Sequence, residues 1–381
     1  MKTNILYIHH AGELGGAPKS LSILLQGLDK EKYEATVFML VNGPAKYLFN
    51  KLEIKTIVSK YKLHAFHGTT VSGMHFKLFV KNIIYFLPNI FAAYKVIKKV
   101  KPQIIHLNTT CLFMYAIAAK LSFKKIKVIS HVREPLLDGF FGNLLKYFNR
   151  LFVDYFIAIN EFESLPFKDK KVKVIKNSVD IDLYKYNYNT RKKEREALNF
   201  TKDDFVIGYF ARFNIENGIE DVLKIAKQLI QLKTQITILI YGYEPNILET
   251  KITAIANKMP DNVILKGMVK DVFNKMHAID VLISPFKTPH FSRSVIEAQA
   301  LSIPVIATNV NSQKTLIINE TTGFLYTFDD IHTVLEKILL LKKNTKLYNE
   351  MKLEARIFAM ETFCHKANNK KVYNIYKELY K

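Results

Sequence analysis

The chain has 381 residues, 49% of them hydrophobic and 12% aromatic, a composition that favours a folded protein over a disordered one. This length suits two domains, because a single core rarely grows beyond about 250–300 residues. Only Cys111 and Cys364 are present, too few for a disulfide framework, so a reducing, cytoplasmic setting is expected. The formal net charge of +22 predicts a negatively charged partner, either nucleic acid or an anionic membrane surface.

The segment Phe76–Lys101 favours the membrane surface. It mixes aromatic and aliphatic residues with lysines, as an interfacial amphipathic helix does, although a core helix with a solvated lysine face would show the same pattern. The longest uncharged apolar run, Asn82–Tyr94, contains a proline and is too short to cross a bilayer. No nucleic-acid-binding motif accompanies the charge. We therefore expect no nucleic-acid partner and a peripheral association with the inner face of the cell membrane.

The first half of the chain alternates short apolar strands with helical patterns. A strand at Asn4–His9 is followed by a glycine-rich loop and a helix through Leu21–Leu28. Further strands are expected at Ala35–Leu40, Ile104–Leu107, Val128–His131 and Tyr155–Ile159. Such strands, alternating with helices, indicate a parallel, doubly wound sheet.

The second half repeats this alternation after the polar, charged segment Tyr186–Asp204, which we interpret as a linker. A helix is expected at Ile219–Leu232, and strands are expected at Val206–Phe210, Ile236–Tyr241, Val263–Lys266, Val281–Ser284 and Val305–Thr308. The predicted fold class is therefore α/β, with two Rossmann-like domains in tandem. We expect the first at residues 1–190 and the second at 191–360, with a C-terminal helix at 361–381 that returns to the first.

Ligands of such sheets bind beyond the carboxyl ends of the strands. In the first domain, the loop after the first strand contains Gly12, Gly15 and Gly16 and precedes a helix. Glycines let the backbone approach a ligand, and the helix N-terminus would offer unpaired amides to an anion. A purely structural tight turn would have the same sequence, so both readings stay open.

Polar side chains also end two other strands of the first domain. His131, Arg133 and Glu134 follow the strand that begins near Val128, and this position at the carboxyl edge favours a functional role over a structural one. His106 ends the preceding strand, where a hydrogen-bonded core histidine is an equally good interpretation.

The second domain offers Arg212 and Glu297. Arg212 lies directly between a strand and a helix, where it could pair with a phosphate or form a surface salt bridge. Glu297 is expected in the first turn of a helix that begins near Ser294 and buries Ile296, Ala300 and Leu301. A carboxylate there either stabilises the helix N-terminus or accepts hydrogen bonds from paired sugar hydroxyls.

The region around Glu297 resembles glycosyltransferase family 4, whose members are retaining enzymes of the GT-B fold. The resemblance lies in "SPFKTPHFSRSVIEAQALSIPVIATNV" followed by "NETTGFLY". The resemblance extends over nearly the whole chain through "GGAPKSL", "KNSVDIDLY", "GYFARF", "VILKGMVKDV" and "VYNIYKEL". It implies two Rossmann-like domains that face a central cleft and bind a nucleoside-diphosphate sugar.

The resemblance also implies roles for individual residues. Glu297 would bind the ribose hydroxyls of the donor, Arg212 its diphosphate, and His131 its sugar or phosphate, which makes these three the expected catalytic residues. The expected donor-binding residues are Gly15, Gly16, Arg212, His290, Phe291, Ser292, Arg293, Ser294 and Glu297. The expected acceptor-side residues are Gly12, Lys19, Arg133 and Glu134.

Two positions depart from the family pattern. The family has a second glutamate eight residues before Glu297, where this chain has Pro289. The family also has a lysine directly before the glycine that corresponds to Gly218, where this chain has Asn217. One carboxylate contact to the sugar and one cation for the diphosphate are therefore missing. The departures leave open a changed donor contact, compensation by Arg293 or Lys287, or weak catalysis.

The implied reaction moves a sugar to an acceptor hydroxyl, with a lipid-linked or growing bacterial surface glycan as the expected acceptor. We expect no cofactor and no metal, because arginine and helix dipoles can stabilise the leaving diphosphate. The "DID" at Asp180–Asp182 resembles a metal-binding DxD, but we interpret it as structural. The alternatives are a nucleotide-sugar epimerase of the same fold and a catalytically weak, basic membrane-binding protein.

Overall fold

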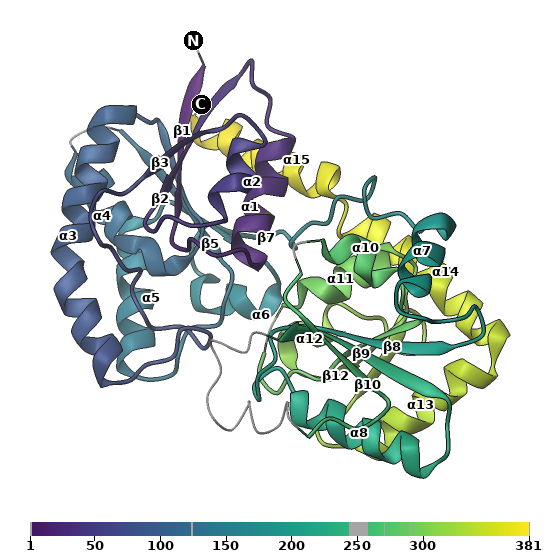
Figure 1. Cartoon of the computed structure of the whole chain (residues 1–381). Helices are drawn as coiled ribbons and strands as arrows, with labels where there is room; N and C mark the ends of the chain where they lie inside the picture. The colour runs from purple at the N-terminus through teal and green to yellow at the C-terminus, as the bar shows by residue number, and fades with distance from the viewer. Residues whose placement is uncertain (1, 123–124, 244–257, 270, 290, 381) are drawn as a thin grey trace. The chain divides into compact units, whose positions relative to one another are not determined.

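The computed structural model describes residues 2–122, 125–243, 258–269, 271–289 and 291–380 (Figure 1). The chain forms two compact units. The first unit comprises Met1–Ser178 and His365–Lys381, and the second comprises Val179–Cys364. Compared with the expected division, residues 179–190 belong to the second unit, and the chain returns to the first unit at His365 rather than at residue 361.

The first unit is built on a seven-stranded parallel sheet in the order β3-β2-β1-β4-β5-β6-β7. Its strands are β1 (Thr3–His9), β2 (Tyr33–Met39), β3 (Lys55–Val58), β4 (Ile104–Leu107), β5 (Lys127–Val132), β6 (Tyr155–Ala158) and β7 (Val172–Val174). The sequence predicted all but β3 and β7. These two form the sheet edges and are only partly buried, so they lack the continuous apolar run of the inner strands.

Helices cover both faces of this sheet, as the alternation along β1 illustrates. Leu6 and Ile8 point into a core with α3 and α4, whereas Ile5 and Tyr7 point into a core with α1 and α15. The helices of the unit are α1 (Gly16–Gln26), α2 (Lys46–Asn50), α3 (Phe76–Val100), α4 (Phe113–Leu121), α5 (Phe140–Phe152), α6 (Glu161–Ser164) and α15 (His365–Tyr380). Within the described part of this unit, 3₁₀ turns occur at Thr110–Leu112 and Leu165–Phe167.

The C-terminal helix α15 is part of the first unit (Figure 1, yellow). Asn369 Nδ2 donates to the carbonyl oxygen of Ile23 at 2.8 Å, and the Tyr373 hydroxyl donates to that of Leu24. Val372, Ile375 and Tyr376 are buried in the same core as Ile5 and Tyr7. The last residues of the chain therefore complete one face of the first sheet.

The second unit contains a six-stranded parallel sheet in the order β10-β9-β8-β11-β12-β13. Its strands are β8 (Phe205–Phe210), β9 (Ile236–Tyr243), β10 (Val263–Gly267), β11 (Val281–Ser284), β12 (Val305–Thr308) and β13 (Gly323–Tyr326). Its described helices are α7 (Tyr188–Glu196), α8 (Ile219–Gln231), α10 (Val272–Met276), α11 (Arg293–Ala300), α12 (Asn311–Lys314), α13 (Ile331–Lys343) and α14 (Thr345–Thr362). Two Rossmann-like units are thus present, as predicted.

The prediction of a linker at Tyr186–Asp204 was wrong. This segment contains α7, whose Arg191 and Arg195 pair with the Asp280 carboxylate at 2.5 and 3.3 Å. Asp280 is buried before β11, so its charge needs these two guanidinium partners. The high charge of the segment therefore serves tertiary packing, and the sequence alone could not show that its arginines face a buried carboxylate.

Candidate functional site

His131 lies near the end of β5, at the carboxyl edge of the first sheet. Its ring is buried, and its Nδ1 lies 2.7 Å from His106 Nε2 and 3.5 Å from Arg133 Nη2. Burial lowers the pKa of His131 well below its usual value, and the nearby Arg133 and His106 lower it further. The imidazole is therefore neutral at pH 7, when it can offer one N–H donor and one acceptor.

Arg133 is fixed by two asparagines at the same edge. Its Nε and Nη2 donate to Asn108 Oδ1 at 3.1 and 2.8 Å, and its Nη1 donates to Asn177 Oδ1 at 2.6 Å. His131, Arg133, Asn177 and Lys176 line a cavity of about 20 Å³ within the first unit. The edge thus presents a held guanidinium beside a neutral histidine, a combination suited to an anionic or polyhydroxyl ligand.

Glu134 points elsewhere. Its Oε2 accepts a hydrogen bond from the Thr69 hydroxyl at 2.6 Å, and burial raises the pKa of its carboxyl group. The three polar residues predicted as one cluster therefore separate, because Glu134 holds the loop at Thr69 while His131 and Arg133 remain together. His106 is a buried, hydrogen-bonded core histidine, one of its two expected interpretations.

The glycine-rich loop after β1 has two parts. A Cβ on Gly12 would lie 2.5 Å from the Asn42 carbonyl oxygen, so glycine is needed there for the loop to approach residues 42–43. Gly15 is exposed and a Cβ on it would meet nothing within 4 Å. Gly15 caps α1 without a side-chain hydrogen bond, and Gly16 begins the helix, whose first turn has no acidic residue. The Lys19 amide donates to the Gly15 carbonyl oxygen, which is the first hydrogen bond of the helix. Because no acidic side chain lies in the first turn, the start of α1 remains suited to an anion.

Arg212 follows β8 at the carboxyl edge of the second sheet. Its side chain is exposed, and among the described residues nothing pairs with its guanidinium. Its carbonyl oxygen accepts hydrogen bonds from Tyr209 Oη at 3.0 Å and Asn217 Nδ2 at 2.9 Å. Asn217, which replaces the family lysine, thus braces the Arg212 loop through its backbone and adds no charge.

Gly218 joins this loop to the segment after β11. It has a φ of +77°, and a Cβ on it would lie 1.9 Å from the Pro285 carbonyl oxygen. Next to it, the Lys287 amide donates to the Glu216 carbonyl oxygen at 3.1 Å. Only glycine fits this position. The close approach holds the Arg212 loop against the segment that leads to α11.

The start of α8 is less suited to a phosphate than expected. Glu220 and Asp221 occupy its first turn, where carboxylates already compensate the positive end of the helix dipole. Lys287, one of the two proposed substitutes for the missing cation, pairs with Glu220 at 3.0 Å. Arg212 therefore supplies the accessible positive charge of this loop.

Glu297 is only 3% exposed and lies in the second turn of α11, not in the first turn as predicted. Its Oε1 accepts hydrogen bonds from Arg293 Nε at 3.2 Å and Nη2 at 3.1 Å. Burial raises the pKa of Tyr184, and the charge of Glu297 and a hydrogen bond to it raise that pKa further. The carboxylate is thus held by a guanidinium and a phenol, and Arg293 is occupied in placing Glu297.

Among the described residues, no side chain caps the N-terminus of α11. Ser292 caps the helix without a side-chain hydrogen bond to its amides, the Ser292 and Ser294 hydroxyl oxygens lie 2.9 Å apart, and the first turn has no acidic residue. Phe291 is buried beside this cap, whereas His290 lies outside the described residues. An uncapped helix N-terminus without acidic residues favours an anion, and this one follows the segment that contacts the Arg212 loop.

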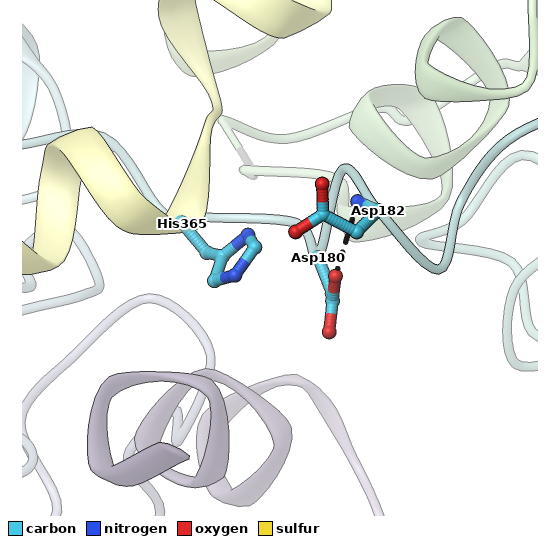
Figure 2. Close-up of side chains that lie close together, drawn as sticks. All are labelled: Asp180, Asp182 and His365. Carbon is cyan, nitrogen blue, oxygen red and sulfur yellow. Dashed lines mark hydrogen bonds between the residues drawn. The ribbon is translucent and has the colours of Figure 1, made fainter. Parts of the chain in front are cut away.

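The aspartates of the "DID" sequence form a turn (Figure 2). Asp180 Oδ1 accepts hydrogen bonds from the backbone amides of Asp182 at 3.2 Å and Leu183 at 3.1 Å. An aspartate that accepts hydrogen bonds from the amides that follow it forms an Asx turn, which gives Asp180 a structural role. The absence of a metal requirement stays a prediction.

Sequence reasoning missed Asn108, Tyr184 and Tyr376. Asn108 directly follows β4, so the rule that selected His131 could have selected it too. Tyr184 and Tyr376 reach the site residues from distant parts of the chain, and no local pattern marks such contacts.

Two family models match the chain. The model of Glycosyltransferase Family 4 matches residues 14–183, and that of Glycosyl transferases group 1 matches residues 190–358. Together they cover most of both units.

Among the similar proteins is the capsular polysaccharide biosynthesis glycosyltransferase CapM of Staphylococcus aureus, 28% identical over 194 residues. The match covers 50% of this chain and 49% of CapM, so this chain spans about half the length of that relative. The UDP-Gal:alpha-D-GlcNAc-diphosphoundecaprenol alpha-1,3-galactosyltransferase of Escherichia coli is 22% identical over 298 residues, which cover 72% of this chain and 75% of that enzyme.

Solved structures share the fold. Anabaena Alr3699/HepE, in complex with UDP, matches with a TM-score of 0.80 and 20% identity over 99% of this chain and 100% of that one. A glycosyltransferase from Rickettsia africae ESF-5 matches with a TM-score of 0.78 and 20% identity over 100% and 99% of the two chains. With a matching model for each unit and this shared architecture, the chain belongs to the group 1, family 4-like glycosyltransferases of the GT-B fold.

Proposed function

We propose that the protein transfers a sugar from a nucleoside diphosphate to an acceptor hydroxyl, with retention of the anomeric configuration. The observation that carries the proposal is the carboxyl edge of the second sheet. There the Arg212 guanidinium, which pairs with nothing in the described part of the chain, lies on a loop that contacts the segment leading to α11 through the Lys287–Glu216 backbone bond and the Gly218–Pro285 approach. The helix α11 follows, with an N-terminus that no described side chain caps and the buried Glu297 carboxylate in its second turn. This edge combines positive charge for a diphosphate with an acceptor for sugar hydroxyls.

The chemistry needs stabilisation of the leaving group. As the bond between the anomeric carbon and the diphosphate oxygen breaks, negative charge grows on the diphosphate and positive charge on the sugar ring. We assign Arg212 and the first amides of α11 to the diphosphate, Glu297 to the ribose hydroxyls, and His131 to the sugar or phosphate. The acceptor oxygen would attack from the face that the diphosphate leaves, and its proton would pass to the departing diphosphate oxygen. No protein nucleophile is needed for this displacement.

The proposed acceptor is a lipid-linked or growing bacterial surface glycan. The names of two relatives support this class, since one acts in capsular polysaccharide biosynthesis and the other on a diphosphoundecaprenol-linked sugar. UDP-sugars are the first donors to test, because the similar HepE structure contains UDP.

The test is a thermal-shift screen of nucleoside diphosphates and their sugars, followed by product analysis. A ligand at about 100 times its dissociation constant adds about 2.7 kcal/mol to the free energy of unfolding. We expect stabilisation by at least one nucleoside diphosphate and a product whose anomeric proton coupling matches that of the donor. A product of inverted configuration would contradict the mechanism. Formation of a free sugar isomer without acceptor would instead identify an epimerase.

We further propose that the first unit docks on an anionic membrane through α3. The outward face of α3 carries an apolar stripe at helical spacing, formed by Phe76, Phe79, Ile83, Leu87, Phe91 and Tyr94. Leu87 is 70% exposed and Ile83 61%. A helix of a soluble protein normally turns such a stripe inward, so this face calls for an apolar partner.

By length and composition alone, α3 could cross a membrane, and most of its apolar stretch is not buried inside the protein. Its other face, however, is bonded to the first unit. Asn82 exchanges hydrogen bonds of 2.8 and 2.9 Å with the backbone of His67, and Asn89 donates to the His64 carbonyl oxygen at 2.9 Å. These contacts favour a helix that lies on a membrane surface over one that crosses it.

The helix α5 extends this face. Phe141 and Phe148 of α5 contact Phe79 and Phe86 of α3. The exposed Phe140, Tyr147 and Leu151 of α5 add apolar area. The lysines of α3 supply the charge that an anionic surface attracts. Lys98 and Lys99 are exposed in its last turn, whereas Lys95 donates to the Tyr61 hydroxyl at 2.7 Å.

Sedimentation with vesicles tests this docking. The full chain should bind vesicles that contain phosphatidylglycerol more tightly than neutral ones, and high salt should weaken the binding. Lys98→Gln with Lys99→Gln should reduce binding roughly 30-fold, at about 1 kcal/mol per lysine. Ile83→Gln with Leu87→Gln should also reduce vesicle binding. The control is Leu353→Gln, which changes an exposed apolar residue of the second unit and should leave vesicle binding unchanged. Equal recovery on both kinds of vesicle would refute the proposal.

A further inference from the structure

A chain of hydrogen bonds runs through the core of the first unit to His131. The Tyr7 hydroxyl lies 3.2 Å from the Tyr376 hydroxyl, which lies 2.6 Å from His106 Nδ1, and His106 Nε2 lies 2.7 Å from His131 Nδ1. Tyr7, His106 and Tyr376 are fully buried. Tyr376 belongs to α15 and is 270 residues from His106, so the end of the chain supplies a partner to the carboxyl edge of the first sheet.

We propose that Tyr376, acting through His106, holds His131 in the tautomer with its proton on Nε2, so that His131 donates a hydrogen bond to the sugar or phosphate of the donor. The assignment of a donor ligand rests on the proposed function, whereas the tautomer rests on the geometry alone. Tyr376 and His106 are positioning residues in this scheme. Among the described residues, His131 Nε2 has no hydrogen-bond partner, so it is the ring nitrogen left for a ligand.

The four groups are all neutral at pH 7. Burial lowers the pKa of His106 to about 3 and that of His131 well below its usual value. Burial also raises the pKa of Tyr7 and Tyr376. Each imidazole then carries one N–H, so the bonds from Tyr376 through His106 to His131 must all point in the same direction.

Two contacts select that direction. The Arg133 guanidinium, which can only donate, faces His131 Nδ1 at 3.5 Å, so Nδ1 is best left as an acceptor. His106 then donates from Nε2, accepts at Nδ1 from the Tyr376 hydroxyl, and Tyr376 accepts from Tyr7. In the opposite direction one buried phenol proton, that of Tyr7 or of Tyr376, would have no acceptor among the described residues, an arrangement that a folded protein avoids.

The consequence is a histidine that is a donor and not a general base. An Nε2–H fixed by buried partners does not depend on solvent for its orientation, and its neutral ring adds no charge. This suits a residue that orients or stabilises a ligand oxygen, and it fits a displacement that needs no protein base.

The test reads the tautomer directly in the full chain with ¹⁵N-labelled histidine. His131→Gln assigns the His131 signals among the 11 histidines. We expect the wild-type spectrum, without ligand, to show His131 protonated on Nε2. Tyr376→Phe should produce a mixture of the two tautomers, whereas Tyr373→Phe should not. Tyr373 is the matched control, because its hydroxyl lies on the same helix and donates to Leu24, outside the chain of bonds.

Turnover gives the second readout. With the best UDP-sugar of the donor screen, Tyr376→Phe should lower kcat about fivefold while the affinity for UDP alone stays within about twofold of wild type, since one neutral hydrogen bond is weakened. A wild-type His131 protonated on Nδ1 would overturn the proposal, even if Tyr376→Phe failed to fold. An unchanged tautomer in folded Tyr376→Phe would overturn the role of Tyr376. The predicted tautomer together with normal turnover in His131→Gln would instead refute the donor contact, and with it that part of the proposed function.

Discussion

The replacement of Glu297 by glutamine separates a ligand-binding carboxylate from a helix-stabilising one. Glutamine has nearly the same shape and can still accept hydrogen bonds from Arg293 and Tyr184, so the second unit should fold. What disappears is the negative charge. If Glu297 binds the ribose hydroxyls, each charge-assisted hydrogen bond is worth about 1.5–3 kcal/mol, which corresponds to a loss of roughly 10- to 150-fold in kcat/KM for the donor.

A loss of stability accompanies this change, because the side chains of Arg293 and Glu297 are only 12% and 4% exposed. Removing one partner of such a pair leaves the other charge unpaired, which is more costly than removing both. Glu297→Gln should therefore lower the melting temperature, and Arg293→Gln combined with Glu297→Gln should recover part of it. The donor affinity should stay low in both variants.

The assays are thermal unfolding, titration with the donor and initial rates. If folded Glu297→Gln matches wild type in donor affinity and turnover while its melting temperature falls, the carboxylate serves the helix and the ribose role is wrong. If recovery of stability in the double variant also restores donor affinity, the effect on binding was indirect.

Three further predictions concern charge, backbone and pH. Arg212→Ala should reduce transfer about 100- to 1000-fold, as for other lost transition-state donors, while Asn217→Lys should preserve or raise it; equal rates in Arg212→Ala and wild type would exclude the diphosphate role. Gly218→Ala should lower the free energy of unfolding by at least about 1–2 kcal/mol, because the φ of Gly218 is +77° and a Cβ would meet Pro285. Gly15→Ala should lower it by less, because a Cβ on Gly15 meets nothing within 4 Å and only the N-cap preference for glycine over alanine is lost; urea unfolding of both variants decides this. Burial lowers the pKa of His10 to about 4 in the folded state, whereas its pKa in the unfolded chain is about 6.5. The free energy of unfolding should therefore decrease as the pH falls from above 6.5 toward 4, by about 1.4 kcal/mol between pH 7.5 and 5.5. His10→Gln should remove this part of the pH dependence, and an unchanged pH dependence in the variant would contradict the prediction.

Local sequence patterns were sufficient to predict the inner strands of both sheets. β1, β4 and β11 are short, apolar and buried on both faces, so the run of residues itself reports the environment. β3, β7 and β13 were not predicted. β3 and β7 are partly exposed and have no such run, and β13 is only four residues long and begins with a glycine. The prediction for the charged segment that contains α7 was wrong for a related reason, since both of its buried ion pairs are with Asp280, more than 80 residues away.

The candidate site divides in the same way. The rule that ligands bind beyond the carboxyl ends of parallel strands identified His131, Arg133, Arg212 and the helix of Glu297 from the sequence, because chain order places them after strands. It could not assign partners. That Glu134 turns to Thr69 and that Lys287 pairs with Glu220 depends on side-chain directions in three dimensions.

The sequence by itself determined the fold class, the positions of most strands along the chain and the loops that reach the carboxyl edges. These features follow from local hydrophobic periodicity and short-range turns. Only the tertiary structure decided the electrostatic state of the site. The neutrality of His131 comes from burial beside His106 and Arg133, and its link to Tyr376 comes from a helix at the other end of the chain. Burial and long-range hydrogen bonds set protonation and tautomer, and both depend on contacts between residues that are distant in sequence.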